Sequence, residues 1–119
     1  MIAALLSATL LLVPAPTFAA QADEDQLSRR LRACLTSGSA GAPRDSLTSA
    51  VVAVRSLCYT QIRRVREARL RAVDDSFGLP EARLSAAQQE ALDQARKTAT
   101  FQLNDEIARA IANFTGLTE

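Results

Sequence analysis

Apolar residues recur along this chain at intervals of three and four positions, which is the spacing of one face of an α-helix. The first such stripe predicts a helix over about residues 23–35. Acidic residues open that segment and arginines close it, as the helix dipole favours. Residues 36–43 are rich in glycine and serine, so we expect a loop there. The stripe consists of Leu27, Leu31, Cys34 and Leu35.

A second, longer stripe predicts one continuous helix over about residues 46–76. Asp45 or Ser46 can cap its start, and Gly78 and Pro80 stop it. The stripe consists of Leu47, Val51, Val54, Cys58, Ile62, Val65 and Ala72.

A third helix is expected over about residues 85–115. Ser85 and Gln88 have the spacing of a capping box, and Gly116 followed by Leu117 predicts a left-handed helix end. We therefore expect an all-α fold, in which residues 23–119 form one small three-helix domain. The third stripe consists of Ala91, Leu92, Ala95, Ala99, Leu103, Ile107, Ile111 and Phe114.

Residues 1–22 differ from the rest because they carry no charged side chain. An apolar run from Ile2 to Val13 is followed by two prolines, and Ala20-Gln21-Ala22 fits the A-x-A cleavage rule. These features predict a cleavable secretory signal peptide. The run is shorter than the roughly 20 residues that a spanning helix needs. No lysine or arginine precedes it, so an uncleaved anchor is an alternative, and cleavage after Ala19 is another.

Cys34 and Cys58 are the only cysteines, and each lies on the apolar stripe of its helix. An even count in an exported chain favours a disulfide, and two buried free thiols are the alternative. Cys58 lies about twelve residues into its predicted helix, roughly 18 Å along the axis, so a tight antiparallel hairpin would keep the sulfurs apart. We therefore expect helix 1 to be linked to the middle of the long second helix, with the loop running back beside it.

Arginine greatly outnumbers lysine, since Lys97 is the only lysine. This bias is typical of GC-rich genomes and, together with the signal, predicts a bacterial protein that is periplasmic or secreted. The net charge is only +1, but ten arginines fall within residues 29–71 against two acidic residues. An uneven distribution of this kind indicates either an anionic partner or two helices that attract each other.

The sequence offers little for catalysis. It has no histidine, so the usual general base and the commonest metal ligand are missing. It also lacks a C-x-x-C motif and a glycine-rich phosphate loop. We therefore expect a protein that is not an enzyme, with no catalytic residue, metal or cofactor. Acidic residues four positions before basic ones predict surface ion pairs, namely Asp93–Lys97, Asp105–Arg109, Glu67–Arg71 and Asp25–Arg29.

Arginines on the second predicted helix could bind an anionic surface such as lipid or polysaccharide. They wrap the helix instead of forming a single stripe, and nucleic acid is a poor partner because net charge is low and aromatic interleaving is absent. The alternative is a solvated helix that the acidic third helix partly neutralises. A long helix with an alanine-rich stripe also allows a homodimer. The candidate residues are Arg55, Arg63, Arg64, Arg66, Arg69 and Arg71.

Two resemblances follow from these residues. The region from Arg32 to Leu70 resembles small exported two-cysteine α-helical proteins of α-proteobacteria, which implies a compartment and not an activity. The segment Leu84-Ser85-Ala86-Ala87-Gln88 is similar to the L-T-x-x-Q motif of Spy/CpxP-like periplasmic chaperones, which are helical and lack catalytic residues. Here serine replaces threonine and only one copy is complete.

The leading functional hypothesis is an exported, non-enzymatic helical protein that acts by protein–protein contact, as a chaperone or in envelope stress. The runner-up is an envelope-surface binder that uses the arginines of the second helix.

Overall fold

The structure is a computed structural model that describes the backbone of residues 18–118 and the side chains of residues 22–118. The apolar run of the predicted signal lies outside these residues. The described part is all-α, as predicted, and contains no strand. Its elements are α1 (Phe18–Ala40), α2 (Leu47–Leu57), α3 (Tyr59–Ser76), the short 3-10 helix η1 (Glu81–Arg83) and α4 (Ala86–Thr115).

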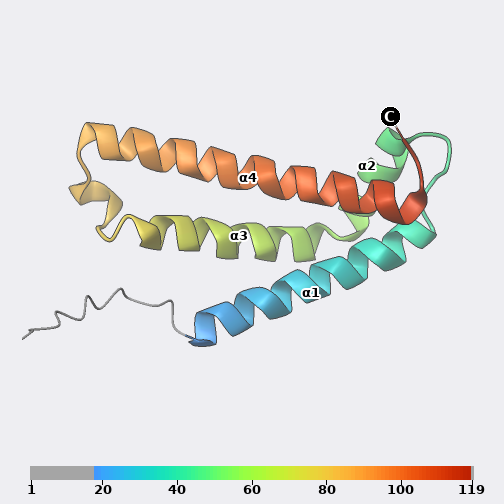
Figure 1. Cartoon of the computed structure of the whole chain (residues 1–119), viewed down its shortest axis with the longest axis horizontal. Helices are drawn as coiled ribbons and strands as arrows, with labels where there is room; N and C mark the ends of the chain where they lie inside the picture. Colours follow the sequence, from blue (N-terminus) through green and yellow to red (C-terminus); the bar gives the residue numbers. More distant parts are fainter. Residues whose placement is uncertain (1–17, 119) are drawn as a thin grey trace, which may run out of the picture.

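Figure 1 shows that α3 and α4 form a long antiparallel hairpin, with the turn that holds η1 at one end. Helix α1 lies along α3 in the opposite direction, and α2 sits at the far end of the hairpin, near the end of α4. The core lies where α1, α2, α3 and α4 meet, and its buried members are Leu31, Leu35, Ala50, Val54, Cys58, Ile62, Val65, Leu103, Ile107 and Ile111.

Most of the predicted apolar stripes face this core, but three of their members do not. Ala72 and Ala91 are exposed, and Phe114 is 42% exposed. The buried side of α4 advances in steps of four, from Ile107 to Ile111 to Thr115, and four residues turn a helix by about 400°. Each step therefore rotates the buried side by about 40° beyond a full turn, so Thr115 and not Phe114 lies in the interior at the end of α4.

The predicted loop over residues 36–43 is wrong for its first half, because α1 continues to Ala40. Gly38 packs against α2 so closely that a Cβ there would lie 3.2 Å from Leu57 Cδ2 and from Val54 Cγ1. Ser39, the next residue, is fully buried. The close contact that glycine permits therefore stabilises a helical turn whose residues have low helix propensity.

The predicted long helix over residues 46–76 is also wrong, because it breaks at Cys58 into α2 and α3. Cys58 has φ −97° and ψ 16°, outside the helical region. Its N–H still donates to Val54 O at 2.9 Å, and its carbonyl accepts from Ile62 N–H at 2.9 Å. The break turns the chain so that Ala50 and Val54 before it and Ile62 after it are all buried in one core.

Both predicted ends of the first helix are wrong, since α1 begins at Phe18 and not near residue 23, but the other predicted helix ends are confirmed. The Ser46 hydroxyl accepts from Ser49 N–H at 3.0 Å, which caps α2. Ser85 and Gln88 form the capping box of α4. Gly78 and Gly116 both have φ 71°, the left-handed conformation that glycine adopts without strain. Local polar chemistry thus determines where these helices begin and end.

Candidate functional site

The disulfide is the first feature that ties distant parts of the chain together. Cys34 Sγ and Cys58 Sγ are 2.07 Å apart, and their Cα atoms are 5.8 Å apart. The predicted pairing is therefore confirmed, and it links α1 to the junction of α2 and α3. Cys34 lies six residues before the end of α1, so the last turns of α1 run beside α2 where a loop was expected.

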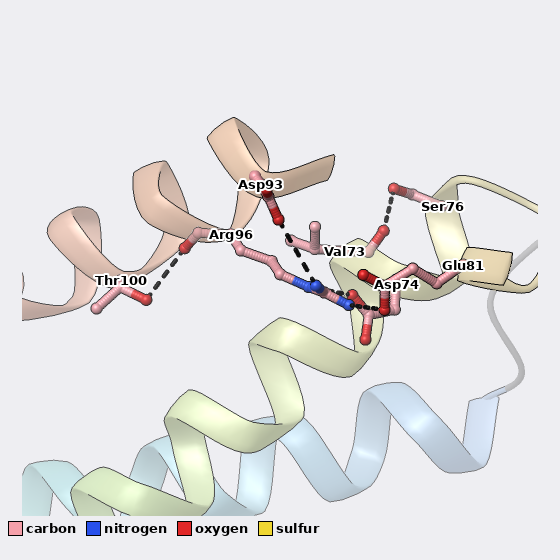
Figure 2. A network of polar contacts seen from close by, with 7 residues as sticks. All are labelled: Val73, Asp74, Ser76, Glu81, Asp93, Arg96 and Thr100. Carbon is pink, nitrogen blue, oxygen red and sulfur yellow. Dashed lines mark hydrogen bonds and ion pairs between the residues drawn. The ribbon is translucent and has the colours of Figure 1, made fainter. Parts of the chain in front are cut away.

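A cluster of charges lies at the opposite end of the hairpin, as Figure 2 shows. Arg96 Nε on α4 donates to Asp74 Oδ1 on α3 at 2.8 Å. Arg96 Nη2 lies 3.4 Å from Glu81 Oε2 on η1, and Nη1 lies 3.9 Å from Asp93 Oδ1. The hydrogen bonds that Arg96 donates to Asp74 and, less strongly, to Glu81 raise the pKa of Arg96 above its usual value. One guanidinium therefore joins three consecutive elements of the chain.

This cluster borders a cleft of about 390 Å³ at the α3–α4 turn. Its only cation is already paired with carboxylates, and no cysteine or histidine faces it. Within residues 22–118, no group of three acidic, cysteine or histidine side chains could hold a metal ion. The ion pairs of Arg96 with Asp74 and Glu81 brace the turn. The lining residues are Asp74, Asp75, Gly78, Leu79, Pro80, Glu81, Leu92 and Arg96.

A smaller groove of about 130 Å³ lies between α1 and α4. Its floor includes the buried side chains of Leu31, Leu103 and Ile107, and Phe114 stands at its edge, half exposed. Arg69 Nη2 on α3 and Glu106 Oε2 on α4 form an ion pair of 2.8 Å on its lining. The groove is therefore mostly apolar, and its lining includes one direct ion pair between Arg69 and Glu106.

The six arginines predicted as an anionic-surface site differ in exposure and in ion pairing. Arg69 forms an ion pair with Glu106 on α4. Arg55 and Arg66 are half-buried, whereas Arg63, Arg64 and Arg71 are exposed on α3. Only one ion pair joins these arginines to α4, so neutralisation by the acidic third helix is slight within the described residues.

The predicted surface ion pairs have mixed outcomes. Asp105 and Arg109 pair at 3.0 Å, as expected. Glu67 lies 4.0 Å from Arg63 and not beside Arg71, and Asp93 contacts Arg96 in place of Lys97. Arg29 donates to the Asp25 backbone carbonyl at 3.3 Å, so that carboxylate is not its partner. Spacing alone does not choose among several nearby arginines.

Sequence reasoning missed the exposed aromatic residues. Tyr59 is 60% exposed at the start of α3, and Phe101 is 72% exposed on α4. Phe101 lies two positions before buried Leu103, so its place off the stripe of α4 was the available signal. Phe114 had been assigned to the core. Leu57, beside the disulfide, is also largely exposed.

Comparison of the chain with protein-family models, with curated proteins and with solved structures finds no match. Along residues 18–118, no helix combines the length and the apolar character that crossing a bilayer requires. The Leu84–Gln88 segment, similar to a chaperone motif, forms the N-terminal cap of α4, with Leu84 buried before it.

Proposed function

We propose that this chain is an exported, non-enzymatic helical protein that acts by contact with apolar segments of other protein chains. The observation that carries the proposal is the placement of its aromatic residues. The sequence has only four phenylalanines and one tyrosine. Of the four aromatic side chains that the structure describes, Tyr59, Phe101 and Phe114 are exposed and Phe77 is half-buried.

Aromatic side chains bury more area than other residues and dominate the binding energy of protein interfaces. The core of this protein is built from aliphatic residues and cysteine, so the exposed aromatics contribute little to folding. Their exposure costs stability that a purely structural protein would gain by burying them. Contact with a partner explains that placement.

The sites are dispersed over α3 and α4, which favours extended apolar segments of varied sequence over one fixed docking partner. Phe114 borders the groove between α1 and α4, where buried leucines and isoleucine form the floor. An unfolded chain can place one apolar side chain there and others against Phe101. The resemblance of the Leu84–Gln88 segment to periplasmic chaperones agrees with this activity.

Export is supported by the apolar run before Pro14 and by the disulfide, because disulfides persist mainly in oxidising compartments. A bacterial periplasm or the medium outside the cell provides those conditions. The absence of histidine from the sequence supports a role without catalysis.

The test is suppression of aggregation by the purified, oxidised mature protein. Light scattering from a client enzyme that aggregates on dilution from denaturant, with no reductant present, gives the readout as the helical protein is added in increasing ratio. We expect dose-dependent suppression that falls markedly when Phe101→Ser and Phe114→Ser are combined. Both residues are exposed, so circular dichroism should show an unchanged fold.

The matched control carries Gln102→Ser and Asn113→Ser, which alter exposed polar neighbours on the same helix. This control should suppress aggregation as well as the unmodified chain does. If the unmodified chain fails to suppress aggregation, or if the aromatic and control variants act equally, the proposal is wrong.

A further inference from the structure

The outward side of α3 shares Tyr59 with the apolar sites above but includes neither Phe101 nor Phe114, which lie on α4. Its exposed residues follow the spacing of one helix face, with core residues Ile62 and Val65 on the opposite side. We call the part of this surface within residues 59–71 the outer face of α3, and it consists of Tyr59, Thr60, Arg63, Arg64, Glu67 and Arg71.

This outer face carries an excess of positive charge. Over residues 59–71 it holds three arginines and one glutamate, so its charge is 3 − 1 = +2, and exposed Asp75 one turn later lowers the charge of the whole outward side to +1. Glu67 lies 4.0 Å from Arg63, which is a weak ion pair between half-exposed side chains. Within residues 22–118, Arg64 and Arg71 form no ion pair with a carboxylate. The charge is therefore free to meet an anionic partner.

One apolar anchor, Tyr59, belongs to this face, and Leu57 lies beside its start at the end of α2. Tyr59 is largely exposed at the start of α3, and Leu57 is exposed two residues earlier at the end of α2. Cys58 between them is fully buried and bonded to Cys34, so the two side chains project from a covalently fixed point. Tyrosine has an apolar ring and a polar tip, which suits the boundary between water and lipid.

We propose that the outer face of α3 binds the headgroups of an anionic phospholipid bilayer, with Tyr59 and Leu57 inserted shallowly. Guanidinium groups spread along a helix attract anionic headgroups, and an apolar ring beside them adds burial at the interface. The apolar side of α3 is already used by the core, so the helix binds on the surface and does not enter the bilayer.

A lipid surface fits better than an acidic protein because the face lies on the convex side of a helix, outside both clefts described above. Neither the cleft at the α3–α4 turn nor the groove between α1 and α4 is lined by any residue of the outer face. Protein interfaces concentrate their energy in side chains that fill pockets. A bilayer needs only a convex surface with charge and a few apolar side chains.

The experiment is co-sedimentation of the oxidised chain with vesicles of phosphatidylcholine, with and without phosphatidylglycerol. We expect binding only to the vesicles that contain phosphatidylglycerol, and release of the protein as salt is raised. Combining Arg63→Ala, Arg64→Ala and Arg71→Ala should lower the partition coefficient about a hundredfold. Tyr59→Ser should lower it about tenfold.

A matched control removes three exposed arginines elsewhere, Arg29, Arg83 and Arg109, each changed to alanine. It has the same net charge as the triple variant of the outer face and should lose much less binding. Glu67→Gln removes the one negative charge of the face and should strengthen binding about fivefold. Circular dichroism of this variant should show an unchanged fold, and its binding should remain restricted to the vesicles that contain phosphatidylglycerol.

Equal binding to both vesicle types, no binding to either, or equal losses in the two triple variants would overturn the proposal. If the chain binds neither vesicle type but binds an acidic protein through the same three arginines, the face binds protein and not lipid. Because the aggregation assay uses other residues, failure here leaves the proposed function standing, and the reverse also holds.

Discussion

Gly38 of α1 lies so close to Val54 of α2 that a Cβ at position 38 would stand 3.2 Å from Val54 Cγ1. Val54 is buried and β-branched, so it has little freedom to move away. This contact lets the last turn of α1 pack on α2 beyond the disulfide. Its contribution to the free energy of unfolding can be measured by substitutions at position 38.

Gly38→Val should lower the free energy of unfolding by about 1–3 kcal/mol, because the added methyl groups overfill the contact with α2. Gly38→Ala should be milder, since gained helix propensity of about 1 kcal/mol offsets part of the clash. Urea titration followed by circular dichroism measures both. Gly41, whose Cβ would meet nothing within 4 Å, is the control position for a valine. Equal losses at the two positions would show that packing on α2 is unimportant.

The disulfide should contribute strongly to stability, because it closes a loop across a small domain. Its cysteines are 24 residues apart, for which the loss of unfolded-chain entropy gives about 3 kcal/mol. The double variant Cys34→Ala, Cys58→Ala should lose about that much in urea titration. Adding a reductant should destabilise the unmodified chain and leave this variant unchanged. A variant as stable as the oxidised chain would contradict the prediction.

Ser39→Ala should leave the protein unchanged or make it more stable by about 1 kcal/mol. The Ser39 hydroxyl is fully buried without a hydrogen-bond partner among the described residues, so its removal relieves an unsatisfied polar group. Thermal melts give the readout. Thr115→Val is the contrasting change, since the Thr115 hydroxyl donates to Ile111 O at 2.7 Å and accepts from Leu117 N–H at 3.2 Å. It should cost about 1 kcal/mol, and a reversed order of the two variants would refute the argument.

Arg96→Ala should lower the melting temperature more than Arg109→Ala does. Arg96 joins α4 to both α3 and η1, whereas Arg109 pairs only with Asp105 on its own helix. The raised pKa of Arg96 means that its contribution is complete below the usual arginine pKa and is lost only in stronger alkali. The difference between the variants should therefore persist at neutral and mildly alkaline pH. Equal melting temperatures would show that the cluster does not brace the turn.

The native protein should lack its first residues and contain an oxidised cysteine pair. Intact-mass measurement of material from the producing cell should match a chain that begins after Ala22, or after Ala19 if the alternative site is used. A mass that still includes Met1, with both sulfurs reduced, would remove the basis for export.

The sequence by itself determined the helical class, the start of α2, the end of α3 and both ends of α4. These features depend on interactions between residues close together, such as the capping box of Ser85 and Gln88 and the left-handed conformation of Gly116. The apolar stripes also identified most of the core, since a period of 3–4 residues fixes which side chains share a helix face.

Only the tertiary structure decided where the long second helix breaks and how far α1 extends. Cys58 leaves the helical conformation because α2 and α3 both pack on α1, and no local signal encodes that contact. Gly38 stays helical because a helix of distant sequence covers it. Tertiary packing also decides that Asp74 pairs with Arg96 and that Phe114 is exposed. Both results depend on which helices meet and at what angle. Long-range packing outweighs local preferences of about 1 kcal/mol, and spacing along one helix cannot reveal it.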